Sequence, residues 1–427
     1  MQYYSLHKKA PKATFKEAVI NGLAPDKGLY FPEHITPLSN NFIENIETFS
    51  NEEIAFEVIK QFIGDSISEK KLKAIIKETI NFKFPVIPIT ENIATLELFH
   101  GPTMAFKDVG ARFMARCLGE FNSEHQEQTV LVATSGDTGG AVANGFLNVK
   151  GVDVVILYPD GKVSDIQEKQ LTTLGQNIRA LKVDGVFDDC QDMVKTAFLD
   201  ADIKRTLTSA NSINIARWLP QMFYFFFAYK QVKHKNKDVV FSVPSGNFGN
   251  ICAGTLAQKL GLPIKHFVAS TNINDTVSQY LKEGNYKPKP SKATISNAMD
   301  DGNPSNFIRI QELFDNNIEQ LKKNFSSYSY SDETTREAMT EIYKSTKYIA
   351  DPHGAIGYLG AKEYLEKNLD AQCIFLETAH PVKFLDIVEE TLHVQLDIPE
   401  QIESVLHKEK KFQKIKTYKE LKTYLNT

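Results

Sequence analysis

The chain has 427 residues, of which 42% are hydrophobic and 24% charged, and its formal net charge is -4. This length is too great for one ordinary hydrophobic core, so we expect two or three domains. The composition is that of a globular protein, which excludes a disordered chain, and the charge favours neither nucleic acid nor an anionic membrane as a partner.

The cysteines argue against a metal site. Cys117, Cys190, Cys252 and Cys373 lie far apart without a CxxC pair, so neither zinc nor a disulfide framework is indicated. The first fifteen residues contain no apolar leader, and the most apolar run, 218–229, contains Pro220 and is shorter than the roughly 20 residues of a membrane span. We therefore expect a cytoplasmic protein with reduced thiols.

The first 90 residues are predicted to form a largely helical region. Ser50 and Glu53 have the spacing of a capping box ahead of apolar residues at helical intervals, and a second amphipathic helix follows around Leu72 to Ile80. Much later, 284–306 is rich in Asn and Lys and is predicted to be an irregular surface segment.

From residue 128 onward, short β-branched runs alternate with glycine-containing turns and helical stretches. The runs are TVLVAT, VDVVILYP, DVVFSVP, IKHFVAS and QCIFLET. This alternation predicts an α/β architecture with mostly parallel sheets. Ligands of such open sheets bind beyond the carboxyl ends of the strands, so the loops after these runs are the places to seek chemistry.

Two of these loops share one design. Ser135-Gly136-Asp137-Thr138-Gly139 follows the first run, and Ser245-Gly246-Asn247-Phe248-Gly249-Asn250 follows the third; each precedes a helical stretch. Glycine lets the backbone approach an anion, and the helix N-terminus favours negative charge. Both loops could instead be simple tight turns. Neither matches GxGxxG or a P-loop, so the anions are not expected to be those of NAD or ATP.

Lys107 is a candidate nucleophile. It lies in HGPTMAFKD, between a strand-like run, ATLEL, and an apolar helical stretch. Desolvation and the positive end of a helix lower the pKa of an amine, which a Schiff-base lysine requires. Taken alone, Lys107 is better interpreted as one of many solvated surface lysines.

Taken together, the motifs resemble those of one family. HGPTMAFKD, ATSGDTGGAV, SANSINIAR, PSGNFGN, SNAMD and ETAHPVKF occur in the order and spacing seen in threonine synthases of the bacterial and fungal branch, and the N-terminal YYSLHKKAPKATFKEAVINGLAPDKGLYFP is similar too. The resemblance covers nearly the whole chain. It implies a tryptophan-synthase-β-like fold, in which pyridoxal phosphate lies between two open, mostly parallel α/β domains. We expect a helical region over 1–90, a large cofactor domain over 91–125 and 213–427, and a small substrate domain over 126–212.

The resemblance also implies roles for individual residues. Lys107 is expected to form the Schiff base and to act as mobile acid and base. Gly246, Asn247, Phe248, Gly249 and Asn250 are expected to cradle the cofactor phosphate, Thr378 to bond the ring nitrogen, and Asp137 to approach the ring hydroxyl. Ser135, Gly136, Thr138 and Gly139 are expected to bind the substrate carboxylate, and Ser212, Asn214 and Arg217 the substrate phosphate. No role is assigned to His380 or Lys383, and Asp351 is read as the N-cap of the helix that contains Pro352 and His353.

The implied reaction converts O-phospho-L-homoserine and water to L-threonine and phosphate. One alternative is a phospho-lyase of the same fold that releases 2-oxobutyrate, and another is a cofactor-binding protein without turnover. We expect the enzyme to be a monomer with a small-molecule substrate, no nucleic-acid or membrane partner, and no metal.

Overall fold

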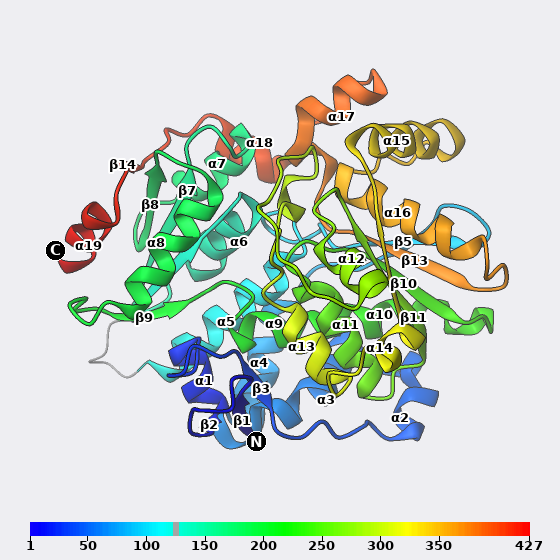
Figure 1. Cartoon of the computed structure of the whole chain (residues 1–427), viewed down its shortest axis with the longest axis horizontal. Coiled ribbons are helices and arrows are strands. Elements are labelled where there is room, and N and C mark those ends of the chain that lie inside the picture. Colours follow the sequence, from blue (N-terminus) through cyan, green and yellow to red (C-terminus); the bar gives the residue numbers. More distant parts are fainter. Residues whose placement is uncertain (123–127) are drawn as a thin grey trace.

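The computed structural model describes residues 1–122 and 128–427. Two larger sheets lie on opposite sides of the molecule, with α5 between them and the N-terminal region beneath (Figure 1). No helix in the described ranges is long and apolar enough to cross a membrane. The four cysteines are free and buried.

The N-terminal region combines helices with a small antiparallel sheet that was not predicted. The Ser50 and Glu53 capping box is confirmed at the start of α3, and the second predicted helix is α4. The elements are β1 (Gln2–Ser5), β2 (Ala13–Thr14), α1 (Phe15–Asn21), β3 (Tyr30–Pro32), α2 (Asn40–Glu44), η1 (Ile46–Thr48), α3 (Asn51–Ile63), η2 (Gly64–Ser66) and α4 (Glu69–Thr79).

The five-stranded sheet is entirely parallel, in the order β14-β8-β7-β6-β9. Its strand β6 is buried along its whole length and β7 at every position except Asp153, which explains their largely apolar sequences. The elements are β6 (Gln128–Ala133), α6 (Asp137–Phe146), β7 (Val152–Pro159), α7 (Asp165–Thr172), β8 (Ile178–Val183), α8 (Phe187–Leu199), β9 (Thr206–Ser209), α18 (Glu400–Leu406), β14 (Gln413–Ile415) and α19 (Tyr418–Asn426).

The six-stranded sheet has the order β12-β11-β10-β13-β5-β4 and is parallel except at β4. Its strands are β4 (Val86–Pro88), β5 (Ile93–Glu97), β10 (Val239–Pro244), β11 (Ile264–Thr271), β12 (Phe325–Ser329) and β13 (Gln372–Glu377). Its helical elements are α5 (Lys107–Phe121), α9 (Ile215–Trp218), η3 (Leu219–Met222), α10 (Phe223–Val232), η4 (Lys233–Lys235), α11 (Gly249–Lys259), α12 (Thr276–Glu283), η5 (Asn297–Met299), α13 (Phe307–Leu313), α14 (Ile318–Asn324), α15 (Asp332–Thr346), α16 (Pro352–Leu365), η6 (Pro381–Phe384) and α17 (Leu385–Leu392).

The structure differs from the predicted domain division near its C-terminal end. Residues 413–427 were expected in the large domain, but β14 pairs with β8 of the five-stranded sheet. The helix α19 also packs against α8 of that half. A three-residue strand is too short to show a periodic pattern, so its long-range pairing leaves no local signal in the sequence.

Candidate active site

A cavity of about 740 Å³ lies between the two larger sheets. Its walls come mainly from the start of α5, the helix α8, the loops after β6, β9, β10 and β13, and the segment 297–305. These loops follow the carboxyl ends of parallel strands, where ligands of open α/β sheets bind. The predicted site residues that line it are Lys107, Ser135, Asp137, Thr138, Ser212, Arg217, Gly246, Asn247, Phe248, Gly249, Asn250 and Thr378; Gly136, Gly139 and Asn214 do not line it.

Lys107 is the first residue of α5, as its position in the sequence predicted. The amide of Phe106 donates to the carbonyl of Thr378 at 2.9 Å, which holds the start of the helix against the end of β13. Burial lowers the pKa of Lys107 to about 8; Asp137 opposes this shift, whereas the cations Lys383 and Arg217 add to it. A substantial fraction of the amine is therefore neutral near pH 8.

The first glycine loop is held from within by Thr134. The Thr134 hydroxyl oxygen accepts from the amide of Gly136 at 2.9 Å and from that of Gly139 at 2.8 Å. These two amides are therefore already bonded, and neither glycine lines the cavity. The amides of Asp137 and Thr138 lie in the first turn of α6, where a helix offers no internal acceptor. An anion at this loop would find donors there rather than at the glycines.

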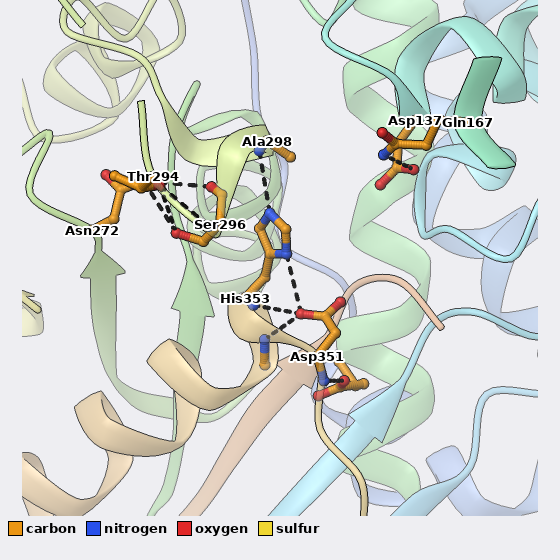
Figure 2. A network of polar contacts seen from close by, with 10 residues as sticks. Asp137, Gln167, Asn272, Thr294, Ser296, Ala298, Asp351 and His353 are labelled. Carbon is orange, nitrogen blue, oxygen red and sulfur yellow. Dashed lines mark hydrogen bonds and ion pairs between the residues drawn. The ribbon is translucent and has the colours of Figure 1, made fainter. Parts of the chain in front are cut away.

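Asp137 is 4% exposed and carries the charge of this loop. Lys383 Nζ lies 2.6 Å from its Oδ1, and Gln167 donates to the same oxygen at 3.0 Å (Figure 2 shows the Gln167 contact). Burial alone would raise the pKa of Asp137, but Lys383 and Lys107 outweigh it and hold that pKa well below its usual range. Asp137 is thus an ionised carboxylate within the cavity wall.

Lys383 was given no role from the sequence, yet it is completely buried beside the cavity. Besides the ion pair, its Nζ donates to the carbonyl of Thr103 at 2.9 Å. Lys383 belongs to η6, in the half of the molecule built on the six-stranded sheet, whereas Asp137 starts α6, in the half built on the five-stranded sheet. The pair therefore joins the two halves across the site. No spacing rule could reveal this contact, because 246 positions separate the partners in the sequence.

The second glycine loop presents neutral donors at the start of α11. A β-carbon added at Gly246 would lie 2.5 Å from Met299 Cα, so only glycine fits there. Phe248 has a φ of 64°, in the left-handed region, immediately before the helix begins. Asn250 accepts from the Tyr224 hydroxyl at 2.7 Å, while its Nδ2 has no partner among the described residues. The loop thus offers free N–H groups to a ligand.

The predicted substrate-phosphate residues have different surroundings. Ser212 donates to Asn247 Oδ1 at 2.6 Å, which links it to the second glycine loop. Arg217 is 2% exposed, donates through Nη1 to the carbonyl of Ala210, and has an Nε without a partner in the described part of the chain. Burial lowers its pKa to about 10, with Asp108 opposing, so the guanidinium stays charged near neutrality.

Asn214 differs from its predicted role as a phosphate ligand. Its Oδ1 accepts from the Ala216 amide at 3.0 Å as the N-cap of α9, and its Nδ2 donates to the carbonyls of Val19 and Ser209. The side chain is fully buried and has these partners outside the cavity. An asparagine ahead of a helix is a common N-cap, and this structural explanation accounts for the residue here.

A buried arginine that sequence reasoning missed holds this segment in place. Arg309 of α13 donates to the carbonyls of Ser212 at 3.0 Å and Ile213 at 2.6 Å, and its guanidinium lies 4.4 Å from the centre of the Trp218 ring. It is fully buried. Arg309 therefore positions the backbone of the Ser212 loop, and a lone arginine in an amphipathic helix gives no signal of such a contact.

Three family models match the chain. "Pyridoxal-phosphate dependent enzyme" matches residues 92–376, "Threonine synthase N terminus" matches 2–80, and "Threonine synthase, C-terminal" matches 354–425. The first of these covers β5, β10, β11 and β12 of the six-stranded sheet, and β13 up to residue 376.

Relatives and solved structures agree with these matches. The threonine synthase of Haemophilus influenzae is 46% identical over 406 residues, covering 94% of each chain. The crystal structure of threonine synthase from Escherichia coli has a TM-score of 0.94 at 40% identity and covers 100% of this chain and 99% of its own. A structure of threonine synthase from Brucella melitensis with pyridoxal phosphate bound has a TM-score of 0.93 at 32% identity, with the same coverage. The chain belongs to the threonine synthase family of pyridoxal-phosphate-dependent enzymes.

Proposed function

We propose that the cavity binds pyridoxal phosphate with its phosphate against Gly246 to Asn250 and its ring between Lys107 and Thr378. The unpartnered Nδ2 of Asn250 and the N-terminus of α11 supply donors for a phosphate, and the missing β-carbon of Gly246 leaves space at the backbone. Thr378 follows β13 at the cavity wall, where its hydroxyl can meet the ring nitrogen. The residues present therefore fit this cofactor.

The substrate we propose is O-phospho-L-homoserine, which carries a carboxylate and a phosphate at opposite ends. The amides at the start of α6, with Ser135 and Thr138, form the carboxylate site. Arg217 and Ser212 form the phosphate site, since the planar guanidinium is charged and its Nε has no partner among residues 1–122 and 128–427. Asn214 contributes by capping α9, which carries Arg217, rather than by direct contact.

The products we propose are L-threonine and phosphate. Bound pyridoxal phosphate supplies the electron sink that stabilises negative charge on the substrate carbons. Lys107 Nζ takes the proton from the α-carbon and later from the β-carbon, because burial keeps a fraction of this amine neutral. The Arg217 guanidinium offsets the charge on the departing phosphate. Phosphate leaves from the γ-carbon, and Lys107 returns one proton to that carbon to form the methyl group. Water then adds its hydroxyl group at the β-carbon, its remaining proton leaves with the phosphate, and Lys107 returns the second proton to the α-carbon, which completes threonine.

The observation that carries this proposal is the position of Lys107. One amine with a lowered pKa lies in a cavity that also contains both glycine loops, Arg217 and Thr378. The test is to incubate the purified protein with pyridoxal phosphate and O-phospho-L-homoserine, measure phosphate and identify the carbon product by NMR. Threonine equal to the phosphate released supports the proposal; 2-oxobutyrate makes the protein a phospho-lyase, and no phosphate makes it a cofactor-binding protein without turnover.

We propose in addition that the enzyme works as a cytoplasmic monomer without nucleic-acid or membrane partners. The support is chemical: the four cysteines are free thiols, as in a reducing compartment, and the formal net charge is only -4. Light scattering on the protein eluting from a size-exclusion column tests the oligomeric state. A mass near 48.1 kDa is expected, and a dimer mass would overturn this part of the proposal.

A further inference from the structure

The segment Ser296–Asp301 forms a wall of the cavity that the proposed function does not use. Asn297, Ala298, Met299, Asp300 and Asp301 all line the cavity. The sequence predicted only an irregular surface segment here. Between α12 and α13 the described residues 284–306 form no strand or α-helix, only the short 3-10 helix η5 (Asn297–Met299). Its position against the site shows that the segment is more than a surface connection.

This segment packs directly on the second glycine loop. A β-carbon at Gly246 would lie 2.5 Å from Met299 Cα and 3.1 Å from the carbonyl oxygen of Ala298. Met299 is 3% exposed, so it has no free space into which to withdraw. The position of the Ala298 backbone therefore determines how Gly246 lies at the proposed cofactor phosphate.

His353 holds Ala298 from the other side. The amide of Ala298 donates to His353 Nε2 at 3.2 Å, and His353 Nδ1 lies 3.1 Å from Asp351 Oδ1 (Figure 2). Because Nε2 accepts a hydrogen bond, the ring proton is on Nδ1 and is donated to Asp351. The imidazole is 3% exposed, and Asp351 is itself fixed as the N-cap of α16. The acceptor nitrogen is thus held in one place by buried partners.

The other end of the same segment is also held. Asp300 Oδ1 accepts from Asn272 Nδ2 at 2.9 Å and from the Thr294 hydroxyl at 2.7 Å. On the far side of His353, the Asp351 amide donates to Glu377 Oε1 at 2.6 Å, and Glu377 directly precedes Thr378. His353 therefore lies in one chain of contacts that leads from the ring side of the proposed cofactor site to its phosphate side.

Building on the proposed function, we infer that His353 is a positioning residue for cofactor binding: through the Ala298 amide it fixes Ser296–Asp301 against Gly246 and so shapes the phosphate cradle. The acceptor at the place of Nε2 is the feature that matters. An aromatic ring as such is not required.

Two variants separate this role from a general structural one. In His353→Asn the amide can reach Asp351, as Nδ1 does, but it is too short to accept from Ala298. In His353→Gln the longer amide can place an oxygen near the position of Nε2. We expect the cofactor-free His353→Asn protein to bind pyridoxal phosphate about threefold to tenfold more weakly, as for the loss of one hydrogen bond, and His353→Gln to recover most of that loss.

A second probe tests which end of the cofactor is affected. Pyridoxal lacks the phosphate, so its dissociation constant should be the same in His353→Asn and in the parent protein. The ³¹P resonance of bound pyridoxal phosphate should shift in His353→Asn and return in His353→Gln. The control is His266→Asn, which changes a largely buried imidazole of β11 that bonds Ser326 outside the cavity; it should alter neither affinity.

The outcomes distinguish the two proposals. An unchanged affinity for pyridoxal phosphate and an unchanged ³¹P shift in folded His353→Asn would overturn the role of His353. Equal losses of affinity for pyridoxal and for pyridoxal phosphate would also overturn it, and so would a His353→Gln protein that does not recover the affinity for pyridoxal phosphate. If the parent protein itself does not bind pyridoxal phosphate, the proposed function fails first. Thermal melting of each variant shows whether it is folded.

Discussion

Two glycine loops follow strands of the two larger sheets, and they present different chemistry to the same cavity. The first contains the ionised Asp137, whose partner Lys383 comes from the other half of the molecule. The second is uncharged and offers free N–H groups, including Asn250 Nδ2. Similar sequences thus form a charged site that depends on distant residues and a neutral site that depends on close backbone packing.

Replacing Lys107, which lies between the two loops, should have the largest effect. Both loops bind the cofactor or the substrate on which the Lys107 amine acts. Lys107→Ala should lower phosphate release from O-phospho-L-homoserine by at least about 10³-fold, since no other base replaces the amine. The control is Lys195→Ala, whose side chain is 67% exposed at the edge of the cavity and should keep most of the activity. Near-normal turnover by folded Lys107→Ala would contradict the assignment.

Breaking the charged loop should reduce stability. Lys383→Met removes the direct ion-pair partner of the buried Asp137 and leaves it with the Gln167 hydrogen bond and the nearby Lys107. Removing one partner of a buried pair costs about 3 to 5 kcal/mol. The urea midpoint of the cofactor-free protein should fall accordingly. Adding Asp137→Asn should restore part of the loss, because the uncompensated charge is then gone.

The comparison for this variant is Lys410→Met. Lys410 Nζ lies 2.6 Å from Asp165 Oδ1 and also pairs with Glu168 Oε2, but the Lys410 side chain is 23% exposed, so water can replace these contacts. The loss of stability in Lys410→Met should be about 1 kcal/mol. Equal losses of stability in Lys383→Met and Lys410→Met would show that burial of the Lys383–Asp137 pair does not matter.

A larger side chain in the neutral loop should weaken binding of the cofactor without changing the charge of the site. Gly246→Ala forces the backbone of Met299 to move, because the new β-carbon would lie 2.5 Å away. We expect about a tenfold or greater rise in the dissociation constant of pyridoxal phosphate, measured by absorbance titration, for about 1.4 kcal/mol or more of strain. Gly249→Ala should do less, since its nearest contacts are at 3.3 Å; the reverse order would contradict this account.

The smallest effect we expect is a change in pH dependence. Only the neutral amine of Lys107 captures the cofactor, so the rate of capture by the cofactor-free protein should rise with pH toward a plateau above about 8. The Asp137 carboxylate favours the ammonium form, so Asp137→Asn should move the midpoint to lower pH. Gly246→Ala should leave the pH midpoint unchanged. A shifted midpoint in this variant would contradict the conclusion that only the first loop affects the charge of Lys107.

Local features of the site could be predicted from the sequence because their causes are local. The start of α5 at Lys107, the capping box of α3 and the N-cap Asp351 each depend on residues within a few positions. The strand-end rule predicted that each glycine loop carries a binding site, but the two loops follow strands of different sheets, so their meeting could be expected only from the family resemblance.

What the sequence did not reveal depends on tertiary contacts. Lys383, Arg309 and His353 each contact a partner that is distant in the chain, and no local sequence pattern identifies that partner, even where the residue itself lies in a motif. Asn214 shows the reverse case, since a residue that the family motif marks as a phosphate ligand also caps α9 and bonds the protein backbone. For these residues the role follows from burial and contacts, which a single sequence does not contain.

The pairing of β14 with β8 also has a consequence for synthesis on the ribosome. Strands β6 to β9 emerge early, but the outer edge of β8 stays unpaired until residues 413–415 have been translated. An unpaired parallel edge is a template for association with other chains. Premature termination before residue 413 should therefore produce a nascent protein that needs chaperone protection, even though every residue lining the active-site cavity has already been made.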